Sequence, residues 1–336
     1  MIPISPAPLE TETWQAALAD AFRSPTQLLR HLGLADDPIA LSLTEDQRFP
    51  VRVPRYFVDL MRPGDPTDPL LRQVLSTQAE NEVTGRFNTD PVGDLAALRG
   101  HGLLQKYRGR ALLITTGACA IHCRYCFRRH FPYDEQSPRM RWDSVAAALT
   151  EMPDVDELIL SGGDPLMLSD RRLGELLASL QGVRSLRRLR IHTRLPVVLP
   201  NRITTDLVEI FAAQRLPVVW VIHANHPNEL SPALQQALAL LRVSGGTLLN
   251  QSVLLKSVND DADTLVTLSK RLFHLGVLPY YLHLLDAVAG AAHFDVAEVE
   301  AQALIRAIRG RLPGYLVPRL VCEIAHEPSK RPVGDG

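Results

Sequence analysis

From about residue 108 onward, the chain alternates short runs of β-branched and aliphatic residues with segments of helical periodicity. Because each run is separated from the next by an amphipathic helical pattern, the sequence predicts consecutive β-α units and a parallel sheet. Crossovers between parallel strands are right-handed, so such a series curves toward a barrel. We therefore expect an α/β fold, a partial (β/α)6 TIM-like barrel, with a split open sheet as the alternative. The predicted strands lie at 111–115, 157–161, 189–193, 218–223, 247–253 and 279–285.

The two ends of the chain differ from this repeat. A strand-like run at 315–324 is expected at the edge of the barrel. Two short amphipathic helices are predicted at 13–21 and 25–32, and segments rich in proline and charge follow them. We predict a mainly helical N-terminal cap over residues 1–100, which covers the barrel or offers a surface to a partner. The barrel domain is predicted over 101–336.

Charge and hydropathy exclude two classes of partner. The 336 residues carry a formal net charge of −1, which provides no basic surface for nucleic acid. No apolar run is long enough to cross a bilayer, and no secretory signal is recognised. We expect a cytoplasmic protein that acts on a small molecule.

Three cysteines, Cys119, Cys123 and Cys126, lie on one short segment after the first predicted strand. Their C-x3-C-x2-C spacing can place three thiolates around a compact metal site and leave one coordination position without a protein ligand. An incomplete shell favours catalysis over a structural role. A structural zinc site closed by His122 or His130 is the alternative. A disulfide framework is disfavoured, because the chain is long and has few cysteines.

Polar residues gather where the predicted strands end, which is where β-α barrels carry their reacting groups. Taken singly, each is commonly a turn or a satisfied core group, but their joint position on one rim predicts an active site. They are the cysteine segment after the first strand, Gly162-Gly163-Asp164 after the second, His192-Thr193-Arg194 after the third, 223–228 after the fourth, 250–252 on the fifth and Asp286 after the sixth.

Two motifs carry a resemblance to a known superfamily. The three cysteines, with Tyr125 before the last one, and the loop Ser161-Gly-Gly-Asp-Pro165 resemble the radical S-adenosylmethionine (SAM) proteins. Most of the remaining chain resembles the lysine 2,3-aminomutases. The run 128–133 and the ending 327–330 resemble most the branch that makes (R)-β-lysine for the modification of translation elongation factor P. The segments that resemble the aminomutases are 123–129, 195–203, 226–229, 250–255 and 291–294.

The resemblance implies an isomerase that converts L-α-lysine to (R)-β-lysine. Moving an amino group between adjacent carbons requires removal of hydrogen from an unactivated carbon, which acid–base catalysis cannot do at neutral pH. A [4Fe-4S] cluster on the three cysteines, SAM and a one-electron donor would supply a radical, and pyridoxal 5′-phosphate (PLP) would carry the migrating nitrogen. The implied pathway partners are elongation factor P and its lysyl ligase.

The resemblance also assigns roles to single residues. Lys330, one of only four lysines, would bind PLP as a Schiff base. Arg110 would hold the cofactor phosphate and Arg128 the substrate carboxylate, because a guanidinium matches both anions. Asp286 and Glu323 would bind the distal ammonium of lysine.

Four more residues are assigned to SAM, and one residue receives a weaker assignment. Gly162, Gly163 and Asp164 are expected to contact the amino end of SAM, and Tyr125 to pack near its adenine. Lys106 is a weaker candidate for the PLP phosphate.

Three hypotheses follow from these patterns. The first is the (R)-β-lysine-forming enzyme. The second is a radical aminomutase that acts on another amino acid, or one that gives (S)-β-lysine from free lysine. The third is a metal-binding interaction module without enzymatic activity. The handedness of the product rests on the resemblance to one branch alone.

Overall fold

The computed structural model of the protein describes residues 13–44, 48–136 and 141–334. Within these residues, one nine-stranded sheet runs in sequence order from β1 to β9. Strands β2 to β8 pair in parallel, and the two-residue strands β1 and β9 pair antiparallel at the edges. The strands are β1 (Leu103–Leu104), β2 (Arg110–Thr116), β3 (Glu157–Gly162), β4 (Arg188–Thr193), β5 (Val218–His223), β6 (Thr247–Val253), β7 (Leu278–His283), β8 (Arg319–Cys322) and β9 (Arg331–Pro332).

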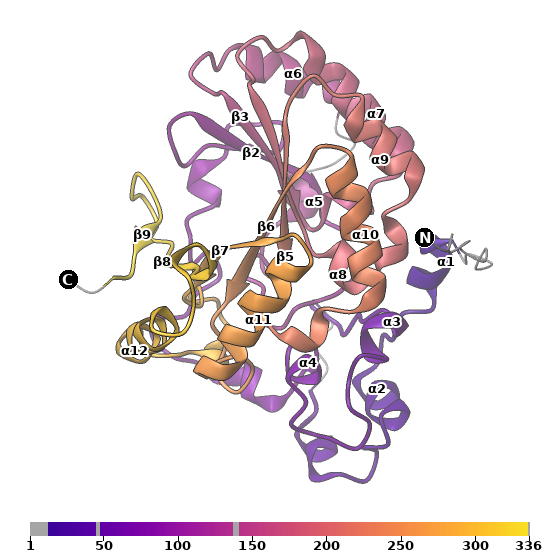
Figure 1. The fold of residues 1–336 in the computed structure, drawn as a ribbon, viewed down its shortest axis with the longest axis vertical. Helices are drawn as coiled ribbons and strands as arrows, with labels where there is room; N and C mark the ends of the chain where they lie inside the picture. Colours follow the sequence, from indigo (N-terminus) through magenta and orange to yellow (C-terminus); the bar gives the residue numbers. More distant parts are fainter. Residues whose placement is uncertain (1–12, 45–47, 137–140, 335–336) are drawn as a thin grey trace.

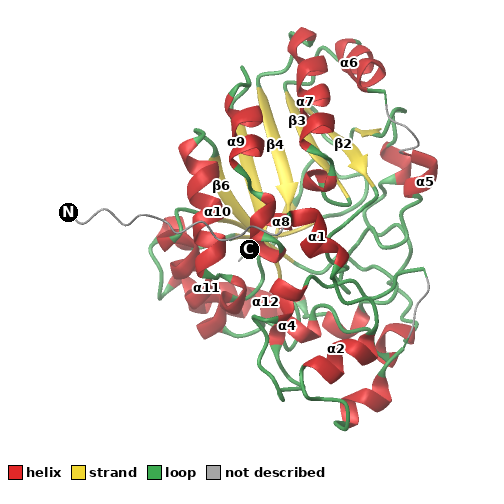
Figure 2. Ribbon diagram, turned by 90° about the vertical axis from the view of Figure 1, so that its right-hand side faces the viewer, coloured by secondary structure: helices red, strands yellow, loops and turns green. Residues whose placement is uncertain are grey.

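Helices connect the parallel strands and cover one face of the sheet. Figure 2 shows α7, α9 and α10 in front of the strands, as expected for crossovers of one hand. In the described part of the chain, the sheet ends at β1 and β9 and does not close into a full barrel. The connecting helices are α5 (Tyr133–Gln136), α6 (Trp142–Thr150), α7 (Asp170–Ser179), α8 (Leu195–Val198), α9 (Thr205–Ala212), α10 (Pro232–Val243), α11 (Ala262–His274) and α12 (Glu298–Arg309).

The local sequence explains where the connecting helices begin. Ser169, Ser231 and Asp261 precede α7, α10 and α11, and each side chain accepts a hydrogen bond from a backbone N–H in the first turn. The helices then bury leucines at helical spacing, such as Leu173 and Leu177 on α7. The predicted α/β fold with a mostly parallel sheet is confirmed, as are all six predicted strands. The run at 315–324 contains β8, which adds a further parallel strand beside β7.

The N-terminal segment is built around short helices, α1 (Trp14–Ala19), α2 (Pro25–His31), α3 (Arg55–Val58) and α4 (Pro69–Arg72). The two helices predicted from the sequence are α1 and α2. Figure 2 places α2 and α4 beyond the arrowheads of the strands. Leu28 and Leu70 belong to the same buried cluster as Leu158 of β3, so this segment shares a core with the sheet. The predicted division into domains at residue 100 stays a prediction, and residues 1–12 of the proposed cap lie outside the described residues.

None of the helices in the described ranges combines the length and the apolar composition needed to cross a membrane. In Figure 1, the C-terminal strands β8 and β9 lie at the opposite edge of the sheet from β2 and β3.

Candidate active site

One cavity of about 750 Å³ lies at the carboxyl ends of the parallel strands. Its walls come from the N-terminal segment, the cysteine loop, the strand ends and the C-terminal tail. Every site residue predicted from the sequence lines this cavity. These residues are Arg110, Cys119, Cys123, Tyr125, Cys126, Arg128, Gly162, Gly163, Asp164, Asp286, Glu323 and Lys330.

The cysteine loop follows β2 and is fixed by the N-terminal segment. The backbone N–H of His122 donates to the carbonyl of Arg52, and that of Arg124 donates to the carbonyl of Gln73, both at 2.9 Å. The Arg124 side chain is fully buried and donates to the two carboxylate oxygens of Glu80, at 2.7 and 2.5 Å. The position of the cysteines therefore depends on residues far away in sequence.

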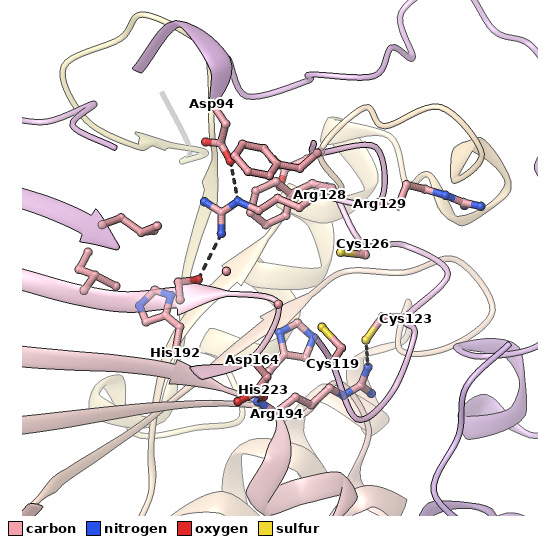
Figure 3. A pocket seen from close by; sticks show the side chains of 18 of the residues that line it. Asp94, Cys119, Cys123, Cys126, Arg128, Arg129, Asp164, His192, Arg194 and His223 are labelled. Atoms are coloured by element: carbon pink, nitrogen blue, oxygen red, sulfur yellow. Dashed lines mark hydrogen bonds and ion pairs between the residues drawn. The ribbon is translucent and has the colours of Figure 1, made fainter. Parts of the chain in front are cut away.

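The three thiols are free and partly buried, and Figure 3 shows them on this loop. Burial, reinforced by neighbouring thiols, raises the pKa of Cys119 well above its ordinary value and that of Cys126 to about 11. Coordination to a metal removes the proton from a thiol. Cluster binding at this loop would therefore release protons.

The histidines proposed to close a zinc site each use a ring nitrogen elsewhere. His122 Nδ1 lies 2.7 Å from the carbonyl oxygen of Pro50, and His130 Nε2 lies 3.1 Å from that of Ala289. Among the described residues, no three His, Cys, Asp or Glu side chains converge on one point as a single ion requires. An iron–sulfur cluster has several irons, and its thiolates need not meet at one point.

The loop after β3 packs directly against the cysteine loop. The backbone N–H groups of Gly163 and Asp164 donate to the carbonyls of Thr116 and Ala118, at 2.7 and 2.8 Å. A Cβ at Gly163 would lie 2.2 Å from the Ala118 oxygen, and Gly162 has a φ of +122°. Both positions therefore require glycine.

The Asp164 carboxylate accepts hydrogen bonds from its own loop, from the end of β4 and from the loop that follows β4. It accepts a hydrogen bond from Thr193 Oγ1 and others from the backbone N–H groups of Leu166, Arg194 and Leu195. Burial outweighs these bonds and raises its pKa to about 6. The Asp164 side chain thus ties the loop after β3 to the loop after β4, and its contact with SAM stays a prediction.

Tyr125 and Arg194 form a buried polar network beneath the cysteine loop. Arg194 Nη1 donates to Cys123 Sγ at 2.7 Å and to the Tyr125 hydroxyl at 2.5 Å, and Figure 3 shows Arg194 beside Cys123. Its Nη2 donates to Glu229 and Gln73. Burial opposes the charge of Arg194, but Cys123, Tyr125 and Glu229 outweigh it and raise its pKa.

Sequence reasoning did not assign a role to Glu229 or Gln73. Glu229 ends the H-P-N-E motif that carried part of the resemblance, so a signal existed for it. Gln73 lies in α4's C-terminal turn, and no motif marks it.

The C-terminal tail returns to the cavity as a hairpin. Strand β9 pairs antiparallel with β8, with Cys322 opposite Arg331. Glu323 directly follows β8 and Lys330 directly precedes β9, so the hairpin brings them face to face. His326 in the connecting loop has a φ of 71°, the left-handed conformation typical of a tight turn.

A series of ion pairs connects five charged residues, namely Asp94, Lys106, Arg128, Glu323 and Lys330. Lys330 forms an ion pair with Glu323, and Lys106 Nζ lies 2.9 Å from Glu323 and 2.6 Å from Asp94. Burial alone would raise the pKa of Glu323, but Lys330 and Lys106 lower it to about 2. Lys106 therefore forms ion pairs with two carboxylates, those of Asp94 and Glu323. Asp94 was not predicted from the sequence.

Asp286, after β7, lines the same cavity. Burial is the main cause that raises its pKa to about 7, and Lys330 opposes this shift. The nearby His283 has its pKa lowered to about 3, mainly by burial. A cationic ligand beside Asp286 would favour its ionised form.

Known proteins resemble this chain over nearly its whole length. Residues 113–260 match the family model described as the Radical SAM superfamily. An L-lysine 2,3-aminomutase of Escherichia coli (strain K12) is 49% identical over 324 residues, which cover 96% of this chain and 94% of that protein. The enzyme of the same name from Haemophilus influenzae is 44% identical, with 98% of each chain covered. That of Clostridium subterminale is 35% identical over 83% of this chain and 67% of its own.

The chain belongs to the L-lysine 2,3-aminomutase family. This family consists of isomerases, and the radical SAM match implies SAM and a [4Fe-4S] cluster, for which C-x3-C-x2-C is the cysteine motif. The predicted family and enzyme class are confirmed.

The cavity contains a group suited to the phosphate of an aminomutase cofactor. Arg110 begins β2, and its guanidinium lies 4.6 Å from the centre of the Tyr107 ring. Its Nε is buried and has no hydrogen-bond partner within the described residues. An unsatisfied buried donor on a guanidinium fits a phosphate oxygen.

Proposed function

We propose that this aminomutase converts L-α-lysine to (R)-β-lysine, which a lysyl ligase then attaches to elongation factor P in the cytoplasm. The observation that supports this function most is that one cavity collects the cysteine loop, Lys330, Arg128 and the acids Asp286 and Glu323. In this proposal, one cavity would hold a radical source, an amine for the cofactor and groups for both ends of an amino acid.

Three bound groups complete the site in this proposal. When bound, the cluster and SAM supply a carbon radical that removes hydrogen from an unactivated carbon, and PLP supplies the conjugation through which an amino group moves to the neighbouring carbon. Cys119, Cys123 and Cys126 would hold the cluster. Lys330 would bind the PLP aldehyde and Arg110 the PLP phosphate. The cluster would be reduced by a one-electron donor.

The loop after β3 and the polar network would hold SAM. Gly162 and Gly163 bring their backbone close to the cysteine loop, where the amino end of SAM is proposed to bind beside the cluster. Asp164 fixes the shape of that loop. Tyr125 also lines the cavity, and its ring is proposed to pack near the adenine.

The charges of the cavity suit a substrate with one anionic and two cationic groups. Arg128 would bind the carboxylate, whereas Asp286 and Glu323 would bind the distal ammonium. Lys330 now contacts Glu323, so its engagement with the cofactor would free that carboxylate for the substrate. Lys106 would keep Glu323 ionised throughout. Two acids at the distal end favour lysine over an acidic amino acid such as glutamate.

A substrate panel tests this proposal. The anaerobically purified protein, loaded with its cofactors, is incubated with a reductant, SAM and either lysine, ornithine, glutamate or alanine, and 3-amino products are identified by mass spectrometry. We expect β-lysine from lysine and at most traces from the other amino acids. A stronger reaction with another amino acid would replace lysine as the substrate.

The pathway assignment requires a second measurement. The product is given to the lysyl ligase together with elongation factor P, and the mass of the factor is compared after incubation with product or with α-lysine. Faster attachment of the product supports the assignment, whereas equal or slower attachment contradicts it.

A further inference from the structure

Asp94 is a buried carboxylate with no role in the proposed function so far. It precedes the 3-10 turn Leu95–Ala97 of the N-terminal segment and is 1% exposed. Its two oxygens contact two different cations, Lys106 at 2.6 Å and Arg128 at 2.6 Å. Figure 3 shows it facing the Arg128 guanidinium.

The contact with Arg128 uses one side of the guanidinium. Asp94 Oδ2 accepts a hydrogen bond from Nε at 2.6 Å, and Ser161 Oγ accepts one from Nη1 at 3.2 Å. Within the ranges that the structure describes, Nη2 contacts no acceptor. Asp94 therefore orients the guanidinium and leaves Nη2 available to a carboxylate in the cavity.

The two charges depend on each other. Burial opposes both, but Arg128 and Lys106 lower the pKa of Asp94, and Asp94 raises that of Arg128. Removing one member of a buried ion pair leaves the other charge uncompensated. Without the Asp94 charge, Arg128 would lose the partner that selects its rotamer.

We propose that Asp94 is a positioning residue for the substrate carboxylate, which it serves by fixing the guanidinium of Arg128. This inference rests on the proposed function, in which Arg128 binds that carboxylate. It gives the N-terminal segment a direct part in substrate binding.

The test compares lysine with cadaverine, which has the same two amines but no carboxylate. Affinities are measured by anaerobic calorimetry on the cofactor-loaded protein without reductant. The wild type should prefer lysine. In Asp94→Asn, lysine affinity should fall about tenfold or more, in line with the loss of a charge-assisted contact, while cadaverine affinity changes by less than about twofold.

Two variants complete the test. Asp94→Glu keeps the charge and should retain more of the preference for lysine than Asp94→Asn. Asp90→Asn is the matched control, because Asp90 accepts hydrogen bonds from the backbone of Asp94 and Leu95 without contacting Arg128, so its preference should equal that of the wild type.

Three results would contradict the inference. Equal weakening of both ligands in Asp94→Asn would show a merely structural role, and a greater loss of preference in Asp94→Glu than in Asp94→Asn would exclude a role of the charge. A wild type without preference for lysine would overturn the proposed role of Arg128 and this inference with it.

Discussion

The antiparallel pairing of β8 with β9, rather than the sequence directly around it, places Lys330 in the cavity. The β8–β9 hairpin sets it opposite Glu323, and Glu323 is in turn held by Lys106 from the strand β1 side of the sheet. A near-terminal lysine is ordinarily a solvated residue, and here its amine lies within the cavity that also contains the cysteines.

Lys330→Ala should abolish PLP binding while leaving iron binding intact. Of the four lysines, Lys106 and Lys330 line the cavity, and Lys106 is held between Asp94 and Glu323, so we expect Lys330 to bind the PLP aldehyde. Binding is read from the absorption of PLP after gel filtration, together with iron analysis. Lys270→Ala, on the exposed surface of α11, is the control and should behave as the wild type. Full PLP retention in Lys330→Ala would refute the assignment.

Asp286 should make lysine binding depend on pH. Its pKa is raised to about 7, so it is neutral below that pH and attracts the distal ammonium only above it. The dissociation constant for lysine should therefore rise about tenfold from pH 8 to pH 6. Glu323, with its pKa lowered to about 2, stays ionised across this range. Calorimetry on Asp286→Asn should show weaker binding with a flat profile, and an unchanged slope in this variant would contradict the prediction.

At the scale of elements, two loops make the site by packing against each other. The cysteine loop after β2 and the Gly162-Gly163 segment at the end of β3 share backbone hydrogen bonds and leave no room for a side chain between them. The parallel sheet brings these loops together, since the ends of adjacent strands meet at one edge.

Gly163→Ala should destabilise the protein and impair cluster assembly. An added Cβ would lie 2.2 Å from a backbone oxygen, so the loops must move apart at a cost of about 1–3 kcal/mol. Gly174→Ala, in α7 with no atom near the added Cβ, should instead stabilise by about 0.5–1 kcal/mol. Urea unfolding and iron content measure both effects. Equal stability of the two variants would mean that the loops do not touch as described.

The sequence predicted the long elements better than the short ones. Strands β2 to β7 are six or seven residues long and bury apolar side chains in runs or in alternation. By contrast, β1 and β9 have two residues each, too few for any periodicity. The hairpin that positions Lys330 was therefore missed, although the lysine itself was identified by resemblance. Asp94 and Gln73 were missed because their partners lie far away in sequence and no local motif marks them.

At the scale of the whole molecule, the N-terminal segment is part of the active site rather than a separate cover. It shares the core of the sheet, receives the backbone of the cysteine loop through Arg52 and Gln73, and supplies Asp94 and Glu80. The sequence alone left the role of this segment open, because its contribution consists of side chains that act across the fold.

Glu80→Gln should lower stability by about 3–5 kcal/mol, because it leaves the buried Arg124 without its charged partner. Thermal unfolding of the iron-free protein gives the size of the effect. Glu175→Gln removes an exposed ion pair with Arg171 on α7 and should change stability by about 0–1 kcal/mol. If the two variants proved equally stable, the buried pair would not hold the cysteine loop in place.

We propose that one cavity joins a radical source to a lysine-binding site, and the resemblance to one branch predicts the (R) product. Chiral chromatography of the product formed from L-α-lysine by the anaerobic, reduced and cofactor-loaded protein tests it most directly. We expect (R)-β-lysine, with none formed by a variant in which Cys119, Cys123 and Cys126 are all replaced by alanine. The (S) product, or no β-lysine at all, would contradict it.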